Sequence, residues 1–402
     1  MPAGSKTPPK AQGAMPAQTA QATTGAQGAR SPLFDQARRG MRRKMAVLAV
    51  VLVLVSLATL PLGSHAMLFH SLDDILSAFG MAAQLVGDAV GSGKFYTQQQ
   101  VTDACPQFYD VWGRVATLYI CILCGGMLAL SGSLYQTVFR NPIAAPTMLG
   151  VGNGVTFGVI ILVLLYGVDA AYHVGEHYLL CYLCAIVILG VVIGIAVAIG
   201  HGEPSVTDML LVGTVLSGLL AQVIVFFSYF VFTDEQWDVY TQVNEVLAVS
   251  TDALSLGIIT LVFLVGTVPV VVARFRLNLV AFDPQDMRMS GSSPTKLRFL
   301  ALGCATVLII GAQVHVGTVA MVALGVPFLS RLVFGAEFSK QTWGDLLLGA
   351  IMLVVCNGLV SLCNILLYQS QIYISLPIGL VANLVTLPLF AWIMASQKRG
   401  WE

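Results

Sequence analysis

A run of histidines and cysteines offers a set of side chains that could bind a metal ion. His173, His177, Cys181 and Cys184 follow the spacing i, i+4, i+8 and i+11, so a helix would place them on one face. Imidazole and thiolate groups are good ligands for zinc and copper. A straight helix would spread these side chains over about 16 Å, at roughly 1.5 Å of rise per residue, so one ion cannot reach all of them. We therefore expect packing roles, with a surface metal site at His173 and His177 as the alternative.

Other reactive side chains also lack the context that catalysis needs. Cys121 and Cys124 form a C-x-x-C pair inside an apolar run, where a thiol behaves as a small hydrophobic group. Cys105 has no evident partner on its predicted side of the membrane, so we expect no structural disulfide. The sequence has no Gly-x-x-x-x-Gly-Lys-Ser/Thr loop to cradle phosphates. We therefore predict a non-enzymatic chain with no cofactor of its own.

The composition predicts that the elements holding these residues are membrane helices. Hydrophobic residues make up 57% of the 402 residues and charged residues only 10%, against about 25% charged in soluble domains. The mean hydropathy of +0.83 indicates the same class. From Leu346 to Gln397 there is no Asp, Glu, Lys or Arg, which is long enough for two spans at about 20 residues each.

We predict an all-α membrane bundle of about ten transmembrane helices. The apolar runs lie near residues 45–62, 115–135, 148–166, 179–200, 209–232, 254–273, 299–315, 317–332, 346–367 and 376–395.

The distribution of charge predicts an orientation with both termini in the cytoplasm. Lys and Arg gather in cytoplasmic loops of membrane proteins. In this orientation, Lys94 and Arg114 are the only ones of the 20 Lys and Arg residues that fall outside. The cluster of basic residues just before residue 45 then fixes the topology and is not expected to bind nucleic acid.

Outside the spans, the chain divides into a tail and two long connections. We expect residues 1–44 to be a disordered cytoplasmic tail with a basic end, since its first part is too polar to bury a core. Residues 45–398 form the predicted transmembrane domain. It includes an external segment at 63–113, with a short helix opening at Ser71, and a polar cytoplasmic loop at 274–298. Within the external segment, we expect residues 94–110 to be loop.

A polar break after the second predicted span is the most informative segment. Two prolines four residues apart interrupt a helix because each lacks a backbone N–H and restricts the preceding residue. The segment closely resembles the loop after the second helix of FecCD-type permeases, which belong to ABC importers for iron-siderophores, haem and cobalamin. The matching residues are Gln136, Asn141, Pro142, Ala144, Pro146, Leu149 and Gly150.

Four further segments resemble the same family, in the same order along the chain. Arg114 matches the first arginine of the motif that enters the second helix, where the resemblance implies docking of an external binding protein. The residues around Asn278 resemble the loop that docks onto the ATPase, and the resemblance implies coupling roles for Asp283, Asp286, Arg288 and Gly291. The last two segments are residues 317–335 and 376–390. The resemblance implies pathway or packing roles for Pro327, Arg331, Pro377 and Gly379 in them.

The resemblance also implies a gate and shows some departures. Ser205, Val206 and Thr207 align with a family gate near the cytoplasmic end of the pathway. The family has a second arginine, a histidine and a glutamate where this chain has Thr117, Phe328 and Ser375. The sequence is therefore identified as a divergent member.

Together these features predict the permease subunit of an ATP-driven importer. The resemblance implies a homodimer in the bilayer of a bacterial or archaeal cytoplasmic membrane, a dimer of ATP-binding subunits with ATP and Mg, and an external binding protein. The cargo would be an iron chelate, haem or a corrinoid. The alternatives are an ion-coupled secondary transporter, which needs ionisable groups inside the membrane, and a membrane metal or redox protein. The predicted spans carry no ionisable group near mid-depth, because Asp208 and Asp345 are expected at span ends, and this disfavours the first alternative.

Overall fold

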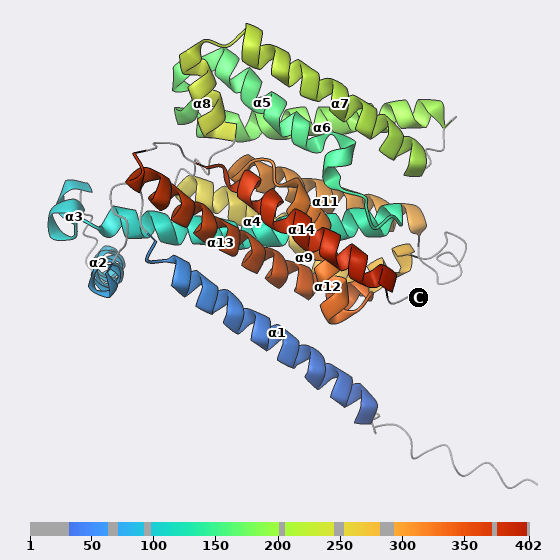
Figure 1. Ribbon diagram of the computed structural model, residues 1–402, viewed down its shortest axis with the longest axis horizontal. Coiled ribbons are helices and arrows are strands. Elements are labelled where there is room, and N and C mark those ends of the chain that lie inside the picture. The colour runs from blue at the N-terminus through green and yellow to red at the C-terminus, as the bar shows by residue number, and fades with distance from the viewer. Residues whose placement is uncertain are drawn as a thin grey trace, which may run out of the picture. The chain divides into compact units, whose positions relative to one another are not determined.

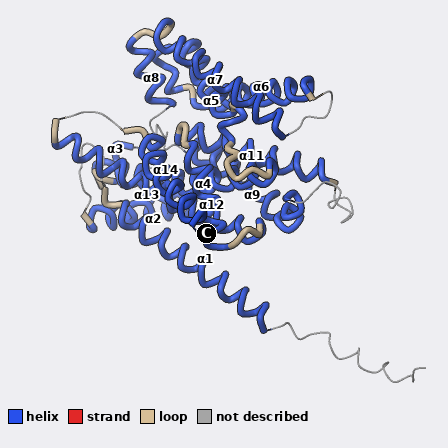
Figure 2. Tube along the Cα trace, turned by 45° about the vertical axis from the view of Figure 1, so that its right-hand side comes forward, coloured by secondary structure: helices blue, strands red, loops and turns tan. Residues whose placement is uncertain are grey.

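The computed structural model describes residues 32–62, 71–91, 98–200, 206–244, 253–281, 293–371 and 376–399. The chain divides into two compact units, Met1–Lys44 and Met45–Glu402. The described residues form helices joined by short loops (Figure 2). The α-helices are α1 (Pro32–Thr59), α2 (Leu72–Gly91), α3 (Gln98–Ala104), α4 (Phe108–Phe139), α5 (Val151–Tyr166), α6 (Val174–Ile199), α7 (Val206–Phe230), α8 (Asp234–Asn244), α9 (Ala253–Leu277), α11 (Pro294–Val316), α12 (Ala320–Phe334), α13 (Phe338–Gln369) and α14 (Ile378–Arg399). The short 3₁₀ helices are η1 (Pro146–Leu149), η2 (Gly167–Tyr172) and η3 (Asn278–Ala281).

The all-α prediction is confirmed, and each predicted apolar run coincides with a helix. Within the described residues, 7 helices are long and apolar enough to cross a membrane: α4, α5 continued by η2, α6, α7, α9 continued by η3, α11 and α13. The apolar helices α12 and α14 are shorter. The number of ten spans and their orientation stay predictions.

Helix α4 is the central element of the second unit. It packs against α13, α11, α12 and α9, while α5 packs against α6, α7 and α8 (Figure 1). Small residues allow the closest approach, because β-carbons built at Gly125 of α4 or Gly349 of α13 would overlap the backbone of the other helix. A β-carbon at Gly132 would likewise overlap the carbonyl group of Ala323 in α12.

Helices α4 and α13 begin about two turns before the apolar runs that predicted them. α4 begins at Phe108 and α13 at Phe338. The first turns of α13 are polar, yet Ser339, Gln341 and Asp345 are buried in the protein. A search for lipid-facing runs misses such turns because their polar side chains point inward. We expected Asp345 at the end of a span. The structure instead places it inside α13, where it is fully buried.

The external segment is also more helical than predicted. Ser71 and Asp74 cap α2 reciprocally, with Asp74 N–H donating to Ser71 Oγ at 3.1 Å and Ser71 N–H donating to Asp74 Oδ2 at 2.9 Å. The expected helix start at Ser71 is therefore confirmed. Residues 98–104 form α3, so the predicted loop is wrong there. Buried contacts among Ala78, Phe108 and their neighbours explain this helix, since they order a segment that is polar in sequence.

The last part of the predicted disordered tail is helical, because α1 begins at Pro32. The prediction of disorder is therefore wrong from Pro32 onwards. The roles predicted for residues 1–44 and 45–398 stay predictions.

Candidate functional site

The segment from Gln136 to Gly150 begins with a left-handed turn at the end of α4. Arg140 has φ 49° and ψ 29°, and its N–H reaches back to the carbonyl of Thr137 at 3.4 Å. Asn141 Oδ1 then accepts the N–H of Ile143 at 3.0 Å. Pro146 opens η1, and Gly150, with φ 74°, joins η1 to α5. The prolines, the asparagine turn and the glycine therefore act locally as the sequence indicates.

The side chain of Gln136 connects this segment to α12. Its Nε2 donates to the carbonyl of Leu324 at 3.2 Å, and its Oε1 accepts a hydrogen bond from Arg331 Nη2 at 2.6 Å. The Arg331 guanidinium also lies 4.5 Å from the ring centre of Phe328. Two segments predicted separately from the family resemblance are thus in direct contact.

This contact belongs to a set of buried and partly buried polar side chains, which we call the polar junction: Ser133, Gln136, Ser330, Arg331, Gln341 and Asp345. Gln341 Nε2 donates to Ser133 Oγ at 2.8 Å, and Ser330 Oγ donates to the carbonyl of Gln341 at 3.2 Å. Asp345 is 0% exposed. The junction therefore joins α4, α12 and α13 by polar contacts at one end of the bundle.

The start of the predicted ATPase-docking loop also touches α13. Asn278 Oδ1 accepts the N–H of Ser339 at 3.2 Å, which satisfies a donor in the first turn of that helix. Glu337, just before the helix, pairs with Lys340 at 2.5 Å and accepts from Ser339 Oγ. The hydrogen bond from Lys340, followed by the one from Ser339, lowers the pKa of Glu337.

A cavity of about 310 Å³ opens beside the polar junction. It is lined by residues from the loop, from η3 and from α12 and α13: Gln136, Thr137, Arg140, Pro142, Asn278, Arg331, Ala336, Phe338 and Gln341. The cavity thus borders three of the segments that sequence analysis singled out.

Several predicted coupling and gate residues cannot be placed. Asp283, Asp286, Arg288 and Gly291 lie outside the described residues, as does Ser205. Val206 is the first residue of α7, followed by Thr207. Their coupling and gating roles stay predictions.

The remaining predicted residues are positioned by packing. Arg114 Nη1 donates to Ser361 Oγ at 2.8 Å, so the guanidinium lies against α13. Pro327 lies inside α12. Gly379 approaches the backbone of Thr318 closely, and the carbonyl of Pro377 accepts the N–H of Leu380 at 3.2 Å. Docking of a binding protein at Arg114 stays a prediction.

The histidine and cysteine face of α6 divides into two environments. Cys181 is buried and donates to the carbonyl of Val155 at 3.5 Å, as the packing interpretation predicts. His173 stacks on Tyr166 with ring centres 3.7 Å apart. Among the described residues, no three His, Cys, Asp or Glu side chains are grouped to hold a metal ion.

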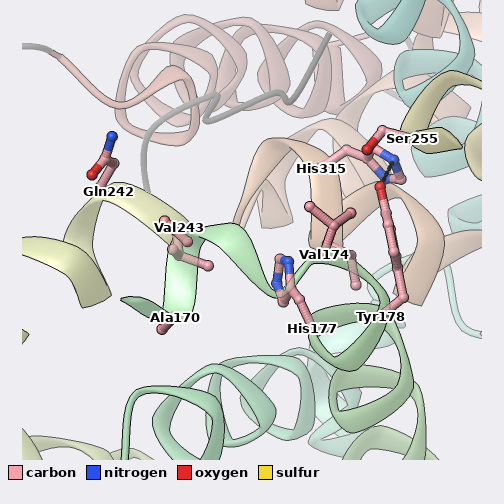
Figure 3. Close-up of a pocket in the computed structure, with 10 residues that line it drawn as sticks. Ala170, Val174, His177, Tyr178, Gln242, Val243, Ser255 and His315 are labelled. Atoms are coloured by element: carbon pink, nitrogen blue, oxygen red, sulfur yellow. Dashed lines mark hydrogen bonds between the residues drawn. The ribbon is translucent and has the colours of Figure 1, made fainter. Parts of the chain in front are cut away.

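His177 lines a second cavity of about 240 Å³ together with Tyr178 and His315 (Figure 3). Tyr178 Oη lies 2.7 Å from His315 Nε2, and His315 Nδ1 lies 2.7 Å from the carbonyl of Gly311. Because a carbonyl oxygen only accepts, Nδ1 of the neutral ring carries the proton and Nε2 accepts from Tyr178. This contact ties α6 to α11.

Sequence reasoning missed Gln341 and the capping role of Asn278, and it misplaced Asp345. The sequence did contain a signal for Asp345. It follows Gln341 by about one helical turn and lies directly before the long uncharged run. Ionisable side chains within membrane helices face the protein interior. Their partners on α4 and α12 are distant in sequence and could not be inferred from it.

The long apolar helices indicate a polytopic membrane protein. The sequence profile of the FecCD transport family matches residues 75–396. The chain belongs to this family.

Similar proteins agree with this assignment. An iron chelatin transport system permease of Helicobacter pylori is 27% identical over 283 residues, covering 70% of this chain and 80% of that protein. A molybdate import system permease of Haemophilus influenzae is 26% identical over 360 residues, covering 88% and 95%. The hemin transport system permease of Yersinia pestis is 24% identical over 289 residues, covering 71% and 82%.

A solved structure has the same fold. It is an inward-facing ABC transporter of metal-chelate type, with a TM-score of 0.68 at 20% identity, covering 88% of this chain and 99% of that one.

Proposed function

We propose that this chain is the membrane-spanning permease subunit of an ATP-driven importer that carries an iron chelate, haem or a corrinoid. Membership of the FecCD family carries this proposal. The relatives named for iron chelatin and hemin transport support this class of cargo. Molybdate is a second candidate, because the alignment with the molybdate permease covers more of both chains.

The permease works with separate partners in this proposal. Two ATP-binding subunits dock at the 274–298 loop and supply ATP and Mg, and an external protein delivers the cargo. The contact between Asn278 and Ser339 supports this arrangement, because it ties the start of that loop to α13. A displacement of the loop would then be passed to α13 and, through the polar junction, to α4 and α12.

The pathway forms between two copies of the chain in a bacterial or archaeal cytoplasmic membrane. An apolar stripe along α7 is one surface available for such a pairing or for contact with lipid, because its side chains are exposed in the single chain. The stripe consists of Leu211, Val215, Leu219, Phe226 and Phe230, which are 54–79% exposed. These spacings keep the side chains on one face of the helix.

Co-purification tests the partnership directly. The chain is co-expressed with a candidate ATPase subunit and isolated through a tag on the permease. We expect the ATPase to co-purify with the wild type and to be lost when Arg288→Glu is combined with Asp286→Lys. The charge reversal Asp169→Lys, at an exposed side chain in η2, is the control and should keep the complex. An ATPase retained by the double variant, or absent from the wild type, would contradict the proposal.

A further inference from the structure

Arg331 and Asp345 share the polar junction without forming a direct pair. The Asp345 carboxylate and the Arg331 guanidinium lie within electrostatic range of each other. Even so, the Arg331 guanidinium donates to Gln136 at 2.6 Å. Neither carboxylate oxygen accepts a hydrogen bond of regular geometry from the described part of the chain. The partly buried Arg331 guanidinium and the fully buried Asp345 carboxylate are thus neighbours, and the guanidinium is hydrogen-bonded to Gln136 instead.

Two polar neighbours of Asp345, Gln341 and Ser330, donate hydrogen bonds to other acceptors. Ser133, Ser330 and Gln341 all lie close to the carboxylate. Gln341 Nε2 donates to Ser133 Oγ at 2.8 Å and to the carbonyl of Pro327 at 3.4 Å, while Ser330 Oγ donates to the carbonyl of Gln341. A buried carboxylate in such surroundings is destabilising in this conformation. It is retained most readily if a second conformation satisfies it.

A change of partner by Arg331 would provide that second conformation. Gln136 lies in the last turn of α4, directly before the break at Arg140, so a movement of the loop displaces its side chain. The cavity of about 310 Å³ is lined by both Gln136 and Arg331, and it leaves room for the guanidinium to reorient. Asp345, in the same polar junction, is then the anionic partner available to the Arg331 guanidinium.

We propose that Asp345 is a positioning residue for transport: it pairs with Arg331 when the Gln136–Gly150 loop moves and Gln136 releases the guanidinium. This inference rests on the proposed importer function. The Gln136-bound and Asp345-bound arrangements are two discrete states of one element, which is what coupling between distant sites requires. Removing the Asp345 carboxylate leaves the Gln136-bound state of Arg331 intact and destabilises the Asp345-bound state.

Two measurements on Asp345→Asn test this role. The variant keeps the side-chain shape and removes the charge. The unfolding midpoint of the purified chain should stay the same or rise, because a poorly satisfied buried anion is gone. In proteoliposomes with the ATPase and binding protein, cargo uptake per ATP hydrolysed should fall by about tenfold, within the usual range of coupling effects.

Matched variants separate positioning from folding. Asp169→Asn makes the same chemical change at an exposed side chain in η2 and should alter neither readout. Gln136→Glu places a carboxylate where Arg331 already binds, so it should hold the first state and also lower uptake per ATP. Both expected results together support the exchange.

Two outcomes would overturn the inference. A midpoint for Asp345→Asn that falls in step with uptake would make the carboxylate a structural partner. Unchanged uptake per ATP would show that no exchange is needed. A wild-type complex without ATP-dependent uptake would refute the importer function itself, and this is seen before any variant is measured.

Discussion

Gln136 Oε1 accepts a hydrogen bond of 2.6 Å from Arg331 Nη2, across 195 positions of sequence. The donor is charged and the acceptor is 3% exposed, so this bond lies largely out of water. It fixes the end of α4 to α12 where the loop begins. The stability of this part of the bundle should therefore depend on both side chains.

Replacing the amide tests that dependence. Gln136→Leu should lower the free energy of unfolding by about 1.5–3 kcal/mol, because a partly buried guanidinium loses its acceptor. Thermal or denaturant unfolding of the purified protein in detergent measures the change. Thr137→Val is the neighbouring control, because within the described residues its hydroxyl bonds the Ser133 carbonyl of its own helix and no other group. Equal losses in the two variants would argue against a special role for the Gln136–Arg331 bond.

The contact between Asn278 and Ser339 predicts a capping effect on α13. Asn278→Ala should cost about 1 kcal/mol of stability, the usual effect of losing such a side-chain oxygen. Asn278→Asp keeps the oxygen and should retain the stability of the wild type. Unfolding curves of the three proteins check this, and an aspartate variant as unstable as the alanine variant would contradict capping.

Close packing of α4 on α13 predicts that glycine is required at their crossing. Gly349→Ala should destabilise the protein by about 1–3 kcal/mol, since its methyl group would meet the Gly125 carbonyl. Gly113→Ala in α4 has open space around it and should be neutral or slightly stabilising. Unfolding midpoints give the comparison, and a tolerated Gly349→Ala would show that the helices can separate without loss.

The predicted orientation can be read from chemical labelling in sealed cells. Ile143→Cys and Tyr172→Cys place thiols at positions that are 48% and 83% exposed. A membrane-impermeant maleimide should label Tyr172→Cys from outside and should reach Ile143→Cys only after permeabilisation. The unsubstituted chain measures labelling of its own cysteines. The reverse order of labelling would place the N-terminus outside.

Much of the fold could be predicted from sequence because membrane helices are long apolar runs. α6 and α7 follow this rule closely. α13 does not, since its first turns carry Gln341 and Asp345, whose polar side chains are buried inside the protein. Helix α3 was missed for a related reason, because tertiary contacts at Phe108 order a polar sequence.

The candidate site could be predicted only in part. The prolines and glycine of the loop act locally, so their effect is visible in the sequence. The bond from Arg331 to Gln136 and the cap from Asn278 join residues far apart in the chain. Such contacts depend on how the helices pack and cannot be inferred from a single sequence.

Transport in proteoliposomes tests the central claim most directly. The permease is reconstituted with its ATPase and binding protein, and uptake of a labelled ferric chelate, haem, corrinoid or molybdate is followed with ATP or with an ion gradient alone. We predict that one of these cargoes enters only when ATP and the binding protein are both present. Uptake that persists in ATP-depleted vesicles under an ion gradient would contradict the account and favour a secondary transporter.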